Sequence, residues 1–119
     1  MNAVEEIQSA IDKLTTLKAE CTPGRWLVDA EDKCSIYYED GGATILQPED
    51  WYPRGDNCPA ENAELVVTLH RTIDAQLAIL YEALDFATTS SAIGMPETEI
   101  LGYYGTTHEI ARAINGGTP

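Results

Sequence analysis

The sequence is poor in basic residues and has only one phenylalanine. Seven Lys and Arg oppose twenty Asp and Glu in 119 residues, which gives a formal net charge of −13 at pH 7. Nucleic-acid phosphates and anionic membrane surfaces are both bound by clusters of Lys and Arg, and the chain has no such cluster. Direct binding to nucleic acid or to an anionic membrane is therefore disfavoured.

The sequence also shows no paired cysteine spacing and no long apolar run, and we expect no leader segment. Cys21, Cys34 and Cys58 form no C-x-x-C pair and leave an odd count, unlike a zinc site or a disulfide framework. Acids occupy the first residues where a signal peptide has basic ones, and no apolar run approaches the ~18 residues of a membrane span. We expect a cytoplasmic protein in which Cys34 is a small buried hydrophobic residue.

What is present predicts one α+β domain over residues 1–119, since a chain of this length can bury a single core. Apolar residues at spacings of three and four predict a helix over residues 1–20, with Asn2 and Glu5 as a capping box. Thr22, Pro23 and Gly24 end it. Over residues 25–46 the apolar period changes to two, which predicts a three-stranded antiparallel meander, and residues 47–59 read as an acidic loop.

A long amphipathic helix is predicted over residues 60–86. Its apolar arc is wider than the roughly 100° stripe that covers one sheet, so a second neighbour is needed. That neighbour could be the first helix, the C-terminal segment or another subunit. For a homodimer, the predicted seam consists of one apolar series: Leu69, Ile73, Leu77, Leu80 and Leu84.

The C-terminal part is predicted to be irregular over residues 87–105, because Pro96, Gly102 and Gly105 interrupt the apolar pattern. A short helix follows over residues 106–115. Thr106 and Glu109 resemble a capping box for this helix, and it ends at a run of asparagine and glycines.

No set of residues points to catalysis. His70 and His108, the two histidines, lie far apart and have no second metal-type ligand at helical spacing, and His70 is better explained as a packed histidine at the edge of the apolar arc. No nucleophile motif or phosphate-binding loop is present, and the paired carboxylates fall in turns or at a helix start. We therefore predict no enzyme activity, no metal and no cofactor.

The stretch from Asp29 to Glu61 combines acids with aromatic residues. Nine carboxylates there oppose only Lys33 and Arg54. Large amphipathic rings are enriched at interaction surfaces. The candidate binding residues are Tyr38, Glu49, Asp50, Trp51 and Tyr52. The alternatives are that Trp51 and Tyr52 pin the loop to the core, and that the acids only solubilise the protein.

One order of features resembles a known group of proteins. Thr22-Pro23-Gly24-Arg25-Trp26, then strands, then Asn62-Ala63-Glu64-Leu65-Val66-Val67 is similar to the small Ead-like accessory proteins of tailed phages and prophages. The resemblance covers residues 1–86. The chain departs from it at His70-Arg71-Thr72, where that family often has a proline, and in a longer, more acidic loop at residues 47–59.

The resemblance implies a phage-encoded accessory protein in a bacterial host's cytoplasm, and it carries no established activity or catalytic residues. The leading hypothesis is a non-enzymatic protein that binds a host or phage protein. A second is an acidic mimic of nucleic acid that blocks a basic DNA- or RNA-binding protein. A third is a binder of small molecules or nucleotide derivatives, with a pocket between sheet and helix near Tyr37, Tyr38, Trp51 or His70.

Overall fold

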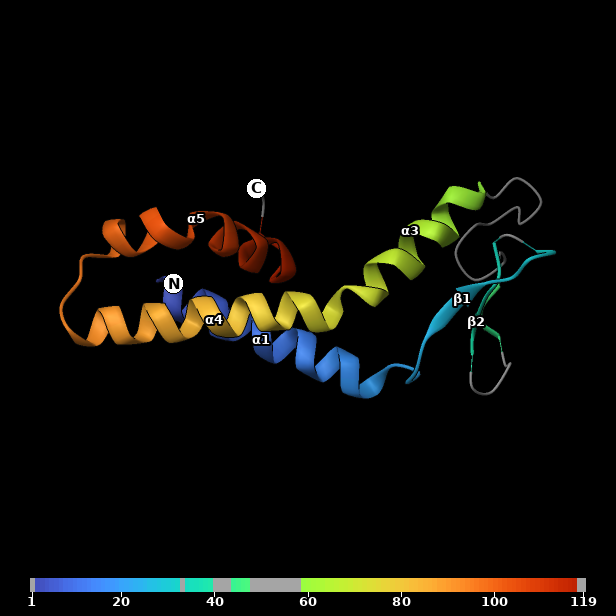
Figure 1. Cartoon of the computed structure of the whole chain (residues 1–119), viewed down its shortest axis with the longest axis horizontal. Coiled ribbons are helices and arrows are strands. Elements are labelled where there is room, and N and C mark those ends of the chain that lie inside the picture. The colour runs from blue at the N-terminus through green and yellow to red at the C-terminus, as the bar shows by residue number, and fades with distance from the viewer. Residues whose placement is uncertain (1, 33, 40–43, 48–58, 118–119) are drawn as a thin grey trace. The chain divides into compact units, whose positions relative to one another are not determined.

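The fold is α+β, as predicted: one helix, a three-stranded antiparallel sheet and then further helices. The computed structural model describes residues 2–32, 34–39, 44–47 and 59–117. Figure 1 shows the order of the elements along the chain. Their bounds are α1 (Ala3–Glu20), β1 (Trp26–Val28), β2 (Ile36–Tyr38), β3 (Thr44–Leu46), α3 (Ala60–Arg71), α4 (Ile73–Ala92) and α5 (Glu97–Ile114).

The chain divides into two compact units. Residues 1–19 and 74–119 form a helical unit that contains α1, α4 and α5. Residues 20–73 form a sheet unit that contains the three strands and α3. In sequence, the sheet unit is an insertion between two helices of the helical unit. The single domain over residues 1–119 stays a prediction.

In the helical unit, α4 has a neighbour on each of two sides. Lys18 near the end of α1 forms an ion pair with Asp74 at the start of α4. On the other side, Phe86 of α4 packs against Tyr103 and Tyr104 of α5, with ring centroids 5.3 and 4.9 Å apart. The first helix and the C-terminal segment, two of the predicted neighbours, thus both contact α4.

Small side chains dominate the core of this unit. Among its buried residues, alanine recurs on all three helices, and Ile7, Ile11, Leu80 and Ile100 supply most of the volume. Alanine side chains allow helix axes to approach closely, which favours dense packing. The buried alanines are Ala3, Ala10, Ala83, Ala87 and Ala111.

Both ends of α5 are tied to the first turn of α1. The backbone N–H of Ala3 donates to Glu97 Oε1 at 2.6 Å, and Asn115 Nδ2 donates to the carbonyl of Glu6 at 3.0 Å. Between these two ties α5 is kinked at Tyr104, where φ is −127° and ψ is 29°.

The sheet unit is a β1-β2-β3 meander covered by α3 on one face. The antiparallel register places Trp26 opposite Tyr38 and Val28 opposite Ile36, and an irregularity follows between Ile36 and Tyr37. Its core is centred on Ile36 of the sheet with Ala63 and Val67 of α3. The predicted strands and their antiparallel pairing are therefore confirmed.

Trp26 links the sheet to α3. Its indole Nε1 donates to the carbonyl of Thr22 at 3.0 Å, and its ring stacks on His70 at 3.7 Å between centroids with 5° between the planes. Indole and imidazole faces in this arrangement exclude water from one another. His70 is thus a packed histidine, as its place at the edge of the apolar arc predicted.

The predicted helix over residues 60–86 is in fact two helices that meet at Thr72. The Thr72 hydroxyl donates to the carbonyl of Leu69 at 2.7 Å, and the Thr72 N–H donates to the same carbonyl at 3.1 Å. A threonine side chain that bonds a nearby carbonyl competes with the helical pattern. This local effect leaves the apolar periodicity intact, so periodicity alone did not reveal the break.

The prediction of irregular structure over residues 87–105 is wrong over most of its length. α4 continues to Ala92, and the turn that follows contains Gly94 with φ +86°. α5 begins at Glu97, directly after Pro96, instead of at residue 106. Proline suits a helix start, and Gly102 and Gly105 lie inside α5 near its kink. The predicted short helix is the second part of α5.

Cys34 is buried and disulfide-bonded, which corrects the expectation that it is only a small hydrophobic residue. Cys21 carries a thiol. Local spacing reveals metal sites and C-x-x-C motifs but not a pairing between distant residues. The cytoplasmic location stays a prediction. Over the described parts of the chain, every helix is too short or too polar to span a membrane.

Candidate interaction surface

The side of α3 that faces away from the sheet carries two leucines. Ala63 and Val67 point into the sheet unit's core and are fully buried. On a helix that turns by roughly 100° per residue, Leu65 and Leu69 lie on the opposite side, one turn apart. Their exposed fractions are 59% and 53%. Two large apolar side chains thus form a short exposed ridge, referred to below as the α3 ridge.

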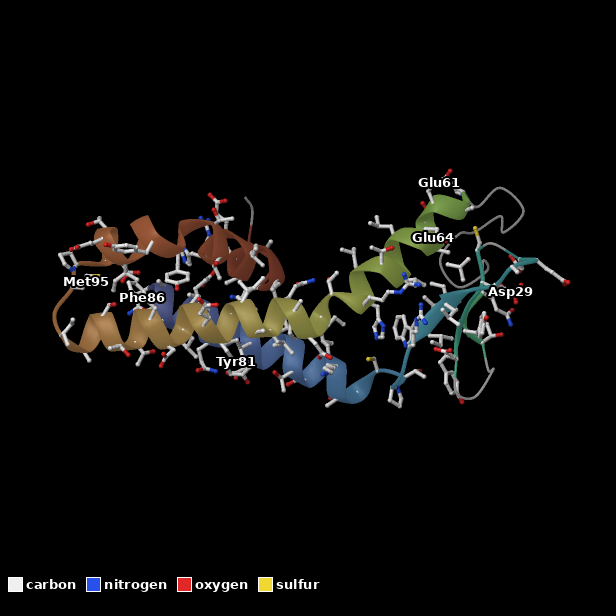
Figure 2. The ribbon with its side chains drawn as sticks, in the orientation of Figure 1. Asp29, Glu61, Glu64, Tyr81, Phe86 and Met95 are labelled. Carbon is white, nitrogen blue, oxygen red and sulfur yellow. The ribbon has the colours of Figure 1, made fainter. Side chains whose placement is uncertain are left out.

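Acidic side chains border the α3 ridge. Glu61 lies one turn before Leu65, so the three residues at 61, 65 and 69 share one line along the helix. Glu64 is exposed on the adjacent line. Both glutamates are labelled on α3 in Figure 2. The ridge therefore combines an apolar centre with a negative border.

The excess of acid extends through the sheet unit. Residues 20–73 include eleven Asp and Glu but only four Lys and Arg. One of the four, Arg25, already has an acidic partner, with its Nη1 atom 3.9 Å from Oε2 of Glu39. Residues 20–73 as a whole therefore carry an excess of negative charge, which attracts positive charge.

The carboxylates after β1 stabilise a turn. Asp29 Oδ1 accepts hydrogen bonds from the backbone N–H groups of Glu31 and Asp32, at 2.8 and 3.0 Å. These bonds, the one from Asp32 first, lower the pKa of Asp29 because they favour its charged form. Asp32 Oδ2 in turn accepts from the Ser35 hydroxyl at 2.8 Å. These two acids thus act in local structure; Figure 2 labels Asp29.

Of the predicted binding residues, Tyr38 alone lies in the described part of the chain. It is half-buried on β2, opposite Trp26. Glu49, Asp50, Trp51 and Tyr52 lie outside the described residues. The predicted acidic and aromatic surface is therefore represented in the structure by one residue.

The predicted dimer seam does not form one exposed surface. Leu80 is fully buried and Leu77 is 9% exposed, both inside the helical unit. Ile73 and Leu84 are half-buried, and Leu69 belongs to the α3 ridge in the other unit. A dimer through Leu77 and Leu80 would require the helical unit to open. The homodimer itself stays a prediction.

From the sequence, Leu69 was predicted to lie in the dimer seam, and Leu65 and Leu69 were not distinguished as an exposed pair. The feature that could have revealed them is the width of the apolar arc predicted for residues 60–86. Residues 63 and 67 already provide the stripe that packs on the sheet, so 65 and 69 exceed what one contact needs. The break at Thr72 completes the explanation, because α3 and α4 need not bury the same side.

The helical unit has exposed apolar groups of its own. Ile79, Tyr81, Ile93 and Tyr103 are between 47% and 76% exposed but come from different helix faces and turns. Figure 2 labels Tyr81, one of these exposed residues. A wide, shallow groove of about 610 Å³ also lies between α1 and α4. Its walls are Val4, Glu5, Gln8, Ser9, Asp12, Leu84 and Thr88.

Chemistry-bearing groups do not converge in the described residues. His70 is stacked on Trp26, whereas His108 lies on α5 in the other unit. Within the same residues, no three His, Cys, Asp or Glu side chains are placed to hold a metal ion. The predicted pocket between sheet and helix would be lined by His70, but Trp26 already covers one face of the His70 ring.

Comparisons with protein-family models, with curated proteins and with solved structures found no match.

Proposed function

We propose that the protein acts by binding another protein, without catalysis, and that the α3 ridge is its contact surface. The observation that carries the proposal is the pair Leu65 and Leu69, each more than half exposed on a helix whose other side is already buried. Contiguous apolar side chains with polar borders are typical of protein interfaces. Truncation of a few such anchors removes most of an interface's affinity.

The proposed biological setting is that of a phage or prophage accessory protein, with a host or phage protein as partner. The support is the resemblance of residues 1–86 to the Ead-like proteins. Its Thr-Pro-Gly-x-Trp turn is the segment in which Trp26 bonds to Thr22 and stacks on His70. A partner-binding role agrees with that family, which has no established catalytic residues.

The test is affinity capture from bacterial lysate with quantitative mass spectrometry, comparing three forms of the full chain. The wild type is compared with the double variant Leu65→Gln/Leu69→Gln, because glutamine keeps a helix propensity close to that of leucine. Ile79→Gln is the matched control, since it removes an apolar side chain of similar exposure from the helical unit.

We expect at least one protein to be retained by the wild type and by Ile79→Gln and to be lost with the double variant. Circular dichroism establishes that all three forms are folded. Retention of the same proteins by all three forms would refute the α3 ridge as the contact surface.

A further inference from the structure

We propose that the partner of the α3 ridge is a basic amphipathic segment, with apolar side chains one helical turn apart and Lys or Arg beside them. This proposal rests on the proposed function and specifies the chemistry of the partner. Two features of α3 carry it: the spacing of its exposed leucines and the sign of the charge around them.

The spacing indicates an elongated apolar contact. Leu65 and Leu69 are separated by one turn, roughly 5–6 Å along the helix. Apolar side chains of a second helix at positions i and i+3 or i+4 have the same spacing, so they can pack between the two leucines in the ridges-into-grooves manner. A partner that offered only ionic side chains would leave the leucines without apolar contacts.

The charge selects the sign of the partner's polar residues. Glu61 and Glu64 lie beside the leucines, where their carboxylates would face the rim of a docked segment. The exposed Arg71 at the other end of α3 is the helix's single Lys or Arg. Opposite charges at a rim speed association and exclude partners of the same charge. Lys or Arg on the partner would therefore meet the glutamates.

A second copy of this chain fits the ridge poorly. Each copy carries a net charge of −13, and two α3 ridges in contact would bring Glu61 and Glu64 of both copies into one interface. Like charges at an interface are unfavourable because they repel and gain no compensating partner. Self-association is thus an outcome of the test and not the expectation.

The experiment measures binding of two labelled synthetic peptides to the full chain by fluorescence anisotropy at physiological salt. Both are amphipathic 18-residue helices with leucine at i, i+4 and i+7 positions. One has lysine on the flanks of the leucine stripe, and the other has glutamate at the same positions. The variants are Leu65→Gln/Leu69→Gln and Glu61→Gln/Glu64→Gln.

The matched controls are Ile79→Gln and Glu82→Gln/Asp85→Asn, which make the same kinds of change on α4. We expect the lysine peptide to bind at least about tenfold more tightly than the glutamate peptide. The leucine variant should weaken that binding about tenfold or more, and the glutamate variant about threefold. The controls should change it less than twofold, which separates the ridge from the general charge of the molecule.

Three results would overturn the proposal. Equal binding of the two peptides would show that the ridge does not select charge. Equal loss in ridge and control variants, with a steep decrease of affinity as salt rises, would indicate an acidic mimic that binds basic surfaces without an anchor. In sedimentation equilibrium, a dimer that Leu65→Gln/Leu69→Gln dissociates to the 13.0 kDa monomer would show that a second copy covers the ridge.

Failure of the partner's chemistry can be told apart from failure of the proposed function. One outcome is a lysate protein that is lost with the leucine variant but retained by Glu61→Gln/Glu64→Gln, and that a cross-link map shows to contact the ridge without Lys or Arg. This outcome would support the α3 ridge as the contact surface and refute the basic partner. If capture is unaffected by the leucine variant, the surface itself is refuted.

Discussion

At the scale of single residues, aromatic stacking connects the sheet to α3. The Trp26 and His70 rings are nearly parallel at 3.7 Å, and the indole N–H is satisfied by the Thr22 carbonyl. The Thr-Pro-Gly turn after α1 thus fixes the tryptophan, and the tryptophan in turn fixes α3. Composition alone would not have paired these rings, because 44 positions separate them in the sequence.

We expect His70→Ala to destabilise the sheet unit by about 1 kcal/mol, the loss of a stacked aromatic pair together with its buried area. Urea unfolding followed by tryptophan fluorescence measures this change. His108→Ala on α5 is the control and should leave the same transition unchanged. A His70→Ala protein as stable as the wild type would mean that the stack contributes nothing.

The oxidation state of Cys34 gives a second prediction at this scale. Alkylation of the unfolded, non-reduced protein, followed by peptide mass spectrometry, should label Cys21 and leave Cys34 unlabelled, because only the thiolate reacts. Reduction before alkylation should expose Cys34 to the reagent. Labelling of Cys34 without prior reduction would show that the disulfide does not form under the conditions of expression.

At the scale of elements, helix ends and breaks were harder to predict than the elements themselves. The capping of α1 was readable, since Asn2 Oδ1 accepts from the Glu5 N–H at 2.9 Å as the Asn-x-x-Glu pattern predicts. The strands could also be predicted, because alternation of apolar residues with period two is a local sequence pattern. The break at Thr72 and the kink at Tyr104 depend on a hydroxyl and on tertiary ties, which periodicity does not record.

The α3 ridge was not among the candidate binding residues predicted from the sequence. Acidic residues together with aromatic ones were expected to mark a binding surface, and the residues named for it were Tyr38 and four residues of the 47–59 loop. The two leucines of the α3 ridge could not be distinguished in the sequence from the other leucines of the same apolar pattern. Only burial separates Leu65 and Leu69, which are exposed, from Leu77 and Leu80, which are covered.

The glycines of α5 give a prediction at the element scale. A Cβ atom at Gly102 or Gly105 would meet nothing within 4 Å, and neither backbone is left-handed. Gly102→Ala and Gly105→Ala should therefore each stabilise the protein by roughly 0.5–1 kcal/mol through helix propensity.

Gly94→Ala is the contrasting substitution. It has the same open surroundings, but its φ of +86° is unfavourable for alanine, so it should destabilise the protein. Thermal unfolding followed by circular dichroism measures all three variants. Should Gly102→Ala or Gly105→Ala lower the melting temperature, the kink at Tyr104 would need glycine for a reason other than space.

At the scale of the whole molecule, the two units have separate cores and separate spectroscopic signals. Both tryptophans, Trp26 and Trp51, fall within residues 20–73, so tryptophan fluorescence reports on the sheet unit alone. Most helical residues lie in α1, α4 and α5, so far-ultraviolet circular dichroism is dominated by the helical unit. The two probes can therefore follow the units independently.

We expect Leu80→Ala to destabilise the helical unit by about 2–5 kcal/mol, because it leaves a cavity at a fully buried position. The circular-dichroism transition in urea should move to lower concentration while the fluorescence transition moves less. Tyr81→Ala, at an exposed neighbouring position, is the control. Equal shifts of the two probes would show that the chain unfolds as a single cooperative body.

The Lys18–Asp74 ion pair joins the end of α1 to the start of α4. The sheet unit is inserted in the sequence between these two helix ends, so the two ends of the insertion leave the helical unit at neighbouring points. A short flexible linker could bridge them, and the three helices would keep their own core. The helical unit would then be a self-contained three-helix body that tolerates removal or replacement of the segment between α1 and α4.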